Sequence, residues 1–306
     1  MGELLGHVND YLKFRRDMGF KLVREGYDLP ELAAYVEATG ATVLTSELAI
    51  AWARDRQCAQ PITIAHRLGA ARGFARYLKS IDPATEIPPL GVVDAHQQRL
   101  TPYLWSTEEI GVLLEGARQL TPELRAATFE TLLGLIAVTG MRLGEAIGLN
   151  REDVNLATGV LTIRQAKFDR DRLVPLHPSA TAALASYARI RDRLAPAPRS
   201  TAFFLTPRGT SLHTSSVDAT FNEITTKIGL RTATARPRIH DLRHNFAVQT
   251  LIDWHRSGTD IGAHMAVLST YLGHSSPAGT YWYLSAVPEL MELAAARLEQ
   301  RYGVQS

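Results

Sequence analysis

Cysteine is almost missing from this sequence, which has a single one, Cys58, among 306 residues. One thiol cannot form an internal disulfide framework, and this scarcity fits the reducing cytoplasm. Long apolar runs are missing too: the run Thr131–Val138 is far shorter than the roughly 20 residues that a bilayer-spanning helix needs. Acidic and polar side chains within residues 1–16 argue against a signal peptide, and Gly6 stands where a myristoylation motif has Ser or Thr. We therefore expect a cytoplasmic protein that does not enter membranes.

The sequence also lacks a strong net charge. Its 33 basic and 31 acidic residues leave a net charge of +2, so bulk charge does not indicate a nucleic-acid partner. The hydrophobic share of 45% and the charged share of 21% are those of a soluble globular protein. We find no internal repeat and no low-complexity tract. A chain of this length favours two domains, and any partner must be inferred from local motifs.

Helices are expected throughout the first domain, which we place at residues 1–82. Apolar residues at helical spacing predict helices over Glu3–Met18 and Leu29–Ala38, and Ser46 is expected to cap a helix over Glu47–Arg54. A longer helix over Pro61–Lys79 begins with proline in its first turn. Its apolar stripe should be core: Ile64, Leu68, Ala71, Phe74, Ala75 and Leu78.

The other faces of the helix 61–79 are rich in polar and basic side chains. They include Thr63 and His66 together with Arg67, Arg72 and Arg76. Two interpretations remain open at this point. The face is either an ordinary solvated surface or one that lies along phosphate groups.

A second domain, residues 102–306, follows a linker at residues 83–101 that contains Pro83, Pro88, Pro89 and Gly91 and has no helical period. Ser106 or Thr107 before two glutamates indicates the start of a helix. Another helix runs from Pro122 to about Val138. Residues 160–175 alternate as a strand, a polar turn and a strand, and the chain after Pro178 is mainly helical again. The pattern predicts a mainly α fold with a small antiparallel β-hairpin.

The stretch beginning at Arg236 reads RPRIHDLRHNFAVQTL and places His240 and His244 four residues apart, as in a zinc-protease helix. Arg243, however, falls on the same helical face as His240 and would repel a metal cation. His240 and Arg243 suit a phosphate better than a metal, because a guanidinium fork matches two phosphate oxygens and a histidine adds a donor. We therefore expect no metal here. His244 is assigned to helix packing or to supporting a neighbouring site residue, and Asp241 to orienting or capping the helix.

The same stretch resembles the second signature box of the tyrosine recombinases, the phage-integrase family. Three further segments resemble the other boxes: VTGMRLGEAIGL at 138–149, RQAKFDRDRLVPLH at 164–177 and LGHSSPAGTYWY at 272–283. Taken singly, the first of these is explained as a glycine-rich helix end and the second as a hairpin with a solvated lysine. Together, the four boxes occur in the family's order over most of residues 102–306. The first hundred residues match only in general terms, as a helical core-binding (SAM-like) domain before an α-rich integrase catalytic domain.

This resemblance implies a site-specific recombinase that cuts and rejoins duplex DNA through a covalent 3′-phosphotyrosyl intermediate, without a cofactor. Integration, excision or transposition of a mobile element is the implied setting. Arg142 and Arg243 would stabilise charge on the scissile phosphate, with Glu145 supporting Arg142 and His274 bonding the phosphate.

Proton transfer and the nucleophile are also implied by the resemblance. Tyr283 is the nucleophile, because its register from His274 fits the family better than that of Tyr281. His240 would assist the phenol in losing its proton, and Lys167 would protonate the leaving 5′-oxygen.

Double-stranded DNA is the implied partner, bound by a homo-oligomer that we expect to be a tetramer on two DNA sites. A C-terminal helix after Tyr283 would contact a neighbouring protomer, unless it packs on its own domain. A type IB topoisomerase and a non-catalytic DNA-binding protein are the alternatives, and the box spacing and the complete catalytic set argue against them. The residues expected to contact DNA are Arg67, Arg72, Arg76, Arg164, Arg236 and Arg238.

Overall fold

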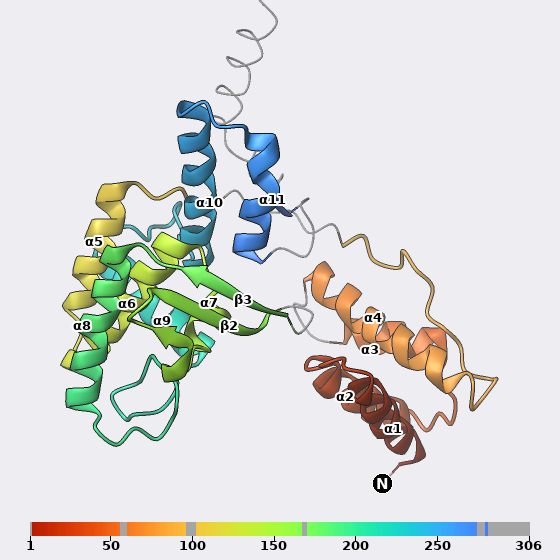
Figure 1. Cartoon of the computed structure of the whole chain (residues 1–306). Coiled ribbons are helices and arrows are strands. Elements are labelled where there is room, and N and C mark those ends of the chain that lie inside the picture. The colour runs from red at the N-terminus through yellow and green to blue at the C-terminus, as the bar shows by residue number, and fades with distance from the viewer. Residues whose placement is uncertain (1, 56–59, 96–101, 167–169, 274–278, 281–306) are drawn as a thin grey trace, which may run out of the picture. The chain divides into compact units, whose positions relative to one another are not determined.

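The chain divides into two units, Met1–Leu100 and Thr101–Ser306, which are described separately below (Figure 1). Both are built mainly from helices, and the second also holds a three-stranded antiparallel sheet. The predicted fold class is therefore confirmed. The computed structural model describes residues 2–55, 60–95, 102–166, 170–273 and 279–280.

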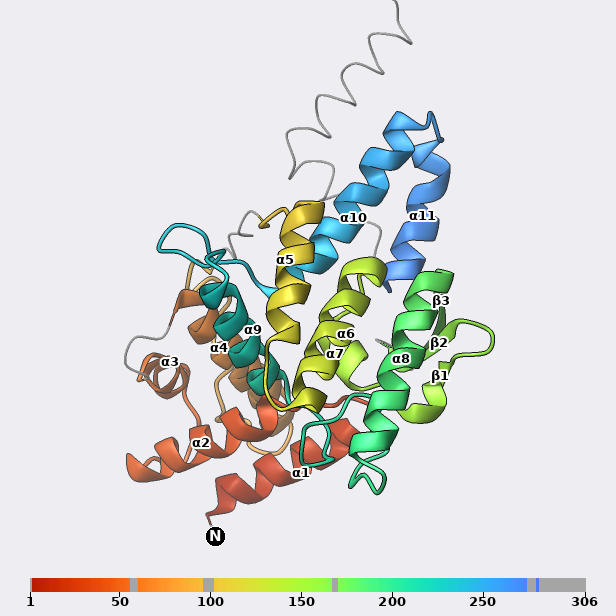
Figure 2. The same cartoon turned by 90° about the vertical axis from the view of Figure 1, so that its left-hand side faces the viewer.

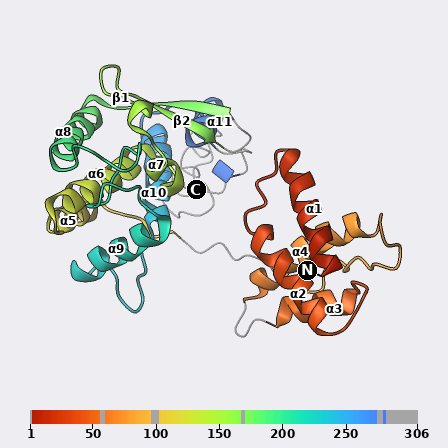
Figure 3. The same cartoon turned by 90° about the horizontal axis from the view of Figure 1, so that it is seen from below.

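Over the described residues, the helices of the first unit lie grouped together (Figure 3) and share one core. Leu29, Trp52 and Phe74 are among its fully buried side chains. The predicted apolar stripe of the fourth helix is confirmed as core, with Ile64 partly buried at its end. The helices are α1 (Glu3–Asp17), α2 (Glu25–Ala38), α3 (Ser46–Arg54) and α4 (Pro61–Leu78).

Two predicted helix starts in this unit were wrong. Helix α2 begins at Glu25 rather than Leu29, because helical hydrogen bonds such as Asp28 N–H to the carbonyl of Arg24 already form before Pro30. The cap of α3 is Thr45, whose hydroxyl accepts the N–H of Leu48 at 3.2 Å. Ser46 is already in the helix, and its own N–H donates to the Glu86 carboxylate at 2.8 Å.

Part of the predicted linker is fastened to this first unit. The N–H of Glu86 donates to the carbonyl of Leu44 at 2.9 Å. Arg72 on α4 donates to the carbonyls of Pro88 and Pro89, both at 2.9 Å. Residues 86–89 thus lie against α3 and α4, and Arg72 holds them there.

In the second unit, α6 (Glu123–Thr139) is the central helix, between α5 (Thr107–Arg118) and α8 (Pro178–Leu194) (Figure 2). It is apolar on most sides, as a helix covered by neighbours should be. The predicted helix start at Ser106 is confirmed by a capping box, in which Ser106 and Glu109 each accept the other's backbone N–H. The helices are α5 (Thr107–Arg118), α6 (Glu123–Thr139), α7 (Leu143–Ile147), α8 (Pro178–Leu194), α9 (Thr214–Lys227), α10 (Ile239–Arg256) and α11 (Ile261–Leu272).

The sheet consists of β1 (Val154–Asn155), β2 (Val160–Ala166) and β3 (Arg170–Pro175), in the order β1-β2-β3. The hairpin formed by β2 and β3 was predicted, whereas the two-residue strand β1 is too short to leave a sequence pattern. Leu161 pairs with Val174, and Ile163 pairs with Arg172. Since Leu161, Ile163 and Val174 are buried, this face of the sheet packs on the core.

Helices α10 and α11 lie side by side and enclose a smaller core of their own (Figures 1 and 2). Val248 and Leu251 of α10 are buried there with Leu268 and Leu272 of α11. Helix α11 ends in a turn at Gly273, which has a φ of +66°. Within the described ranges, we find no helix of the length and apolarity needed to cross a membrane.

Candidate active site

The first signature box forms the turn between α6 and α7. Helix α6 ends where Gly140 adopts a left-handed conformation (φ +61°), which glycine takes without strain. Arg142 then caps α7, and its backbone N–H and Nη1 both donate to the Glu145 carboxylate, at 2.9 and 2.8 Å. The predicted contact between Arg142 and Glu145 is therefore present. The Nη2 of Arg142 donates to the carbonyl oxygen of Gly273 at 2.8 Å.

The second box begins helix α10. Asp241 is buried and accepts the backbone N–H of Arg238 at 2.8 Å, so the predicted capping role of Asp241 is confirmed. Arg243 is only 1% exposed. Its Nη1 donates to the carbonyl of Gly140 at 2.6 Å, and its Nη2 donates to the carbonyl of Leu272 at 2.7 Å.

Arg142 and Arg243, called the arginine pair below, therefore meet at one turn. They bind the consecutive carbonyl oxygens of Leu272 and Gly273, which we call the α11 turn. Arg142 and Gly273 are 131 positions apart in the chain. The structure thus brings the first two boxes to the start of the third.

His240 lies in the first turn of α10, and the residue is exposed to solvent. The ring meets that of His244 edge to face, with the centroids 4.5 Å apart. Burial by the surrounding protein lowers the pKa of His240, the charge of Arg243 lowers it further, and Asp241 opposes the shift. The lowered pKa favours the neutral imidazole, the form that can accept a proton. Among the described residues, no group of three His, Cys, Asp or Glu side chains is arranged to hold a metal ion.

A third arginine, Arg172 on β3, was not singled out from the sequence. Its Nη1 and Nη2 donate in parallel to the two carboxylate oxygens of Glu145, each at 2.9 Å. Burial acts to raise the pKa of Glu145, but the hydrogen bonds and charges of Arg172 and Arg142 outweigh it, so the pKa is lowered. In the sequence, Arg172 had no signal beyond membership of a basic cluster in the hairpin.

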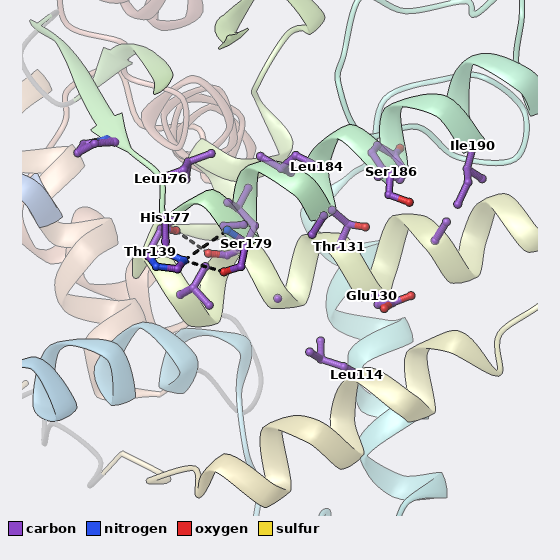
Figure 4. A pocket seen from close by; sticks show the side chains of 18 residues that line it. Leu114, Glu130, Thr131, Thr139, Leu176, His177, Ser179, Leu184, Ser186 and Ile190 are labelled. Atoms are coloured by element: carbon purple, nitrogen blue, oxygen red, sulfur yellow. Dashed lines mark hydrogen bonds between the residues drawn. The ribbon is translucent and has the colours of Figure 1, made fainter. Parts of the chain in front are cut away.

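Two pockets of the second unit differ in their chemistry. One of about 520 Å³ borders Arg142 and is lined by Glu145 and Arg164 among others. The other, of about 670 Å³, lies between α5, α6 and α8 (Figure 4). Its lining is mainly apolar, with Leu114 and Leu184 facing it, and it includes no member of the predicted catalytic set. Of these two pockets, the one beside Arg142 borders a member of the predicted catalytic set.

Three predicted catalytic residues lie outside the described residues: Lys167, His274 and Tyr283. In the sequence, Lys167 falls between β2 and β3, and His274 directly follows Gly273. The predicted C-terminal helix after Tyr283 is outside the described residues as well.

The expectation that Arg67 contacts DNA was wrong. Its side chain is 0% exposed, stacks over the Trp52 ring at 4.0 Å and donates to the Glu31 carboxylate at 2.8 Å. Its guanidinium is occupied by an aromatic ring of α3 and a carboxylate of α2, so a phosphate would have to displace a charged partner to reach it. Arg67 stabilises the first unit instead.

The other five arginines expected at DNA differ in their surroundings. Arg76 and Arg236 are exposed. Arg164 is exposed too but pairs with Glu152 and Asp153, and Arg238 pairs with Asp241. Arg72 is engaged by the carbonyls of residues 88 and 89. Nothing in these contacts tests DNA binding by the five, which stays a prediction.

Comparison with known proteins assigns the family. The model of the phage integrase family matches residues 107–289. A protein of Sinorhizobium fredii (strain NBRC 101917 / NGR234), named as the integrase/recombinase y4rB, is 42% identical over 303 residues, which cover 96% of each chain. Tyrosine recombinase XerD of Mycobacterium tuberculosis (strain CDC 1551 / Oshkosh) is 33% identical over 235 residues, covering 75% of this chain and 69% of that protein.

Solved structures share the fold. The Tn1549 transposon integrase in complex with transposon right end DNA gives a TM-score of 0.67 at 16% identity, covering 96% of this chain and 98% of that one. The XerH site-specific recombinase bound to a palindromic difH substrate gives a TM-score of 0.64 at 21% identity, covering 89% and 78%.

The chain therefore belongs to the phage integrase family and is a tyrosine-type site-specific recombinase. This confirms the resemblance drawn from the four boxes. None of the relatives named above is called a topoisomerase or a non-catalytic DNA-binding protein, so neither alternative gains support.

Proposed function

We propose that the arginine pair holds the scissile phosphate of duplex DNA while Tyr283 attacks it. The observation that supports this most is the meeting of Arg142 and Arg243 at consecutive carbonyl oxygens of the α11 turn. Two guanidinium groups that reach neighbouring acceptors can also reach two non-bridging oxygens of one phosphate. Bonds from arginine to an anionic oxygen are stronger than bonds to a neutral carbonyl.

In the cleavage step, the Tyr283 oxygen forms a bond to phosphorus as the bond from phosphorus to the 5′-oxygen breaks. The 3′-phosphoryl end remains on the tyrosine. Negative charge grows on the non-bridging oxygens in the transition state, and fixed guanidinium donors lower its energy. A 5′-hydroxyl from a partner strand then attacks the phosphotyrosyl bond and releases the tyrosine, so that no cofactor is consumed.

Proton transfer accompanies both steps. A phenol with a pKa near ~10 is a poor nucleophile at neutral pH, so His240 accepts the Tyr283 proton. The lowered pKa of His240 supports this role, because it favours the neutral ring. Lys167 protonates the leaving 5′-oxygen, and His274 donates a hydrogen bond to the phosphate.

The substrate is double-stranded DNA, bound on further phosphates by Arg72, Arg76, Arg164, Arg236 and Arg238. Exposure supports this assignment for Arg76, Arg164, Arg236 and Arg238, and Arg164 also lines the pocket beside Arg142, whereas Arg72 is half-buried. We propose a tetramer on two DNA sites, with the C-terminal helix reaching a neighbouring protomer. Loss of cooperative assembly on two sites after truncation at Pro288 is the test of that contact.

Integration, excision or transposition of a mobile element is the proposed setting, and the cytoplasm the proposed place of action. The name of the 42% identical relative, an integrase/recombinase, supports this setting. Sequencing the DNA that is trapped covalently on the protein would give its target site and cleavage position. A chain that acts on one chromosomal site alone would contradict the mobile-element setting.

A nicked suicide substrate tests the chemistry directly. The full-length protein should form a covalent protein–DNA adduct, Tyr283→Phe should abolish it, and Tyr281→Phe should retain it. The two tyrosines are two residues apart in one segment, so the second variant is a matched control. An adduct on Tyr283→Phe that is lost in Tyr281→Phe would overturn the assignment of the nucleophile.

A further inference from the structure

Strand β3 turns a leucine outward and an arginine inward. Side chains alternate along a strand, so Arg172 shares the inner face of the sheet with Val174, while Leu173 lies on the outer face. Leu173 is 66% exposed, whereas the Arg172 side chain is only 12% exposed. A sheet with one face on the core is expected to show the reverse pattern. Burying a guanidinium is costly unless it is paired, so this inversion requires a specific reason.

The Arg172 guanidinium shares its partner with Arg142. Nη1 of Arg172 and Nη1 of Arg142 both donate to Oε1 of Glu145, at 2.9 and 2.8 Å. The other oxygen, Oε2, accepts Nη2 of Arg172 and the backbone N–H of Arg142, both at 2.9 Å. Two cations on one carboxylate leave a net charge of +1 for an anion. If Arg172 is displaced, Oε1 of Glu145 loses its bond to Arg172, and the carboxylate that holds Arg142 is less firmly fixed.

Arg172 also lies against the residue that holds the other end of Arg142. A Cβ placed on Gly273 would lie 2.1 Å from Nη1 of Arg172 and 3.4 Å from Nη1 of Arg142. Gly273 is the residue whose carbonyl accepts Nη2 of Arg142. Arg172 therefore contacts both the carboxylate and the turn between which Arg142 is held.

We propose that Arg172 is a positioning residue of the recombination reaction. Through Glu145 and Gly273 it fixes the direction of the Arg142 guanidinium, and thereby the charge stabilisation at the scissile phosphate. This inference rests on the proposed role of Arg142 as a phosphate-binding residue. It also explains the inverted pattern of β3, because the inward arginine serves the site rather than the core.

Arg172→Lys in the full-length protein is the first test. Lysine keeps the charge but cannot form the parallel fork on Glu145. We expect single-turnover cleavage of the nicked substrate to slow by about 10- to 100-fold, as misplaced catalytic groups do. DNA affinity and the thermal midpoint should stay near wild type. Arg125→Lys is the matched control, because Arg125 pairs with Glu223 at 2.7 Å on α6 and α9, and its cleavage rate should not change.

A substrate with less charge on the phosphate separates positioning from folding. Replacing one non-bridging oxygen of the scissile phosphate with methyl removes the negative charge that Arg142 neutralises. The gap in cleavage rate between Arg172→Lys and wild type should then narrow, as it should for Arg142→Ala. Arg172→Met, an apolar side chain on the inner face of the sheet, keeps the test open if the lysine variant is unstable.

The outcomes distinguish the two proposals. Full cleavage by Arg142→Ala would overturn the proposed function of the arginine pair. If Arg142→Ala is inactive and Arg172→Lys and Arg172→Met cleave at the wild-type rate, only the inference on Arg172 fails. It also fails if the Arg172 variants are equally slow on the charged and the neutral phosphate, because Arg172 then supports the fold alone.

Discussion

Gly140→Ala should destabilise the second unit and slow cleavage at the same time. Gly140 has a φ of +61°, and a left-handed conformation costs an L-residue about 1–2 kcal/mol. The new Cβ would lie 2.6 Å from Cδ1 of Phe246 and 3.0 Å from Cδ2 of Leu272, well inside the separation of atoms in contact. Such overpacking costs about 1–3 kcal/mol. The sum, about 2–5 kcal/mol, corresponds to a fall of about 4–20 °C in the thermal midpoint for a unit of this size.

The assay is thermal unfolding of the full-length chain followed by circular dichroism, with single-turnover cleavage measured alongside. Cleavage should slow because the Gly140 carbonyl accepts Nη1 of Arg243, and any shift of the turn moves that acceptor. Gly111→Ala is the control, since Gly111 lies in α5 with no atom within 4 Å of an added Cβ. The unfolding free energy of Gly111→Ala should rise by up to about 1 kcal/mol, because alanine has the higher helix propensity. A Gly140→Ala variant as stable as the Gly111→Ala control would refute the reasoning.

Three further predictions concern charged side chains. A lowered pKa moves the protonation of His240 to lower pH, so the cleavage rate should decline only below about pH 6.5. Single-turnover cleavage rates measured against pH check this. A decline that begins above that pH, or that persists in His240→Asn, contradicts it. Arg67→Ala should cost about 3 kcal/mol of unfolding free energy, through the lost stacking on Trp52 and the lost charged hydrogen bond, without a direct effect on DNA contacts. Arg76→Ala should leave stability within about 0.5 kcal/mol but reduce the slope of log affinity against log salt by about one. A lower salt slope in a folded Arg67→Ala protein would argue against the burial of Arg67.

Sequence reasoning succeeded where the interaction is local or carried by a motif. Glu145 lies three residues after Arg142, a spacing that lets one carboxylate meet both the backbone and the side chain of a helix cap. Asp241 meets Arg238 in the same way. The apolar stripe of α4 was likewise visible, because helical spacing alone determines which residues share a face.

The failures concern contacts between distant elements. Helical spacing places Arg67 beside the apolar stripe of α4, but it cannot show that Trp52 and Glu31 from other helices enclose it. Arg172 was not singled out, because the alternation of β3 does not say which face is inward. Its partner, Glu145, lies 27 positions away in the chain. Burial and pairing of this kind depend on tertiary packing and leave no periodic signal.

The two carbonyls of the α11 turn have a consequence for the entropy of DNA binding. An arginine side chain carries about 2 kcal/mol of rotamer entropy, which is lost when its position becomes fixed. Because Arg142 and Arg243 are already held on Leu272 and Gly273, much of this loss occurs when the chain folds. In the proposed function, the scissile phosphate then replaces these carbonyls as the acceptor, and two long side chains need not be ordered afresh. The α11 turn thus acts as a template that keeps the arginine pair ordered before DNA is bound.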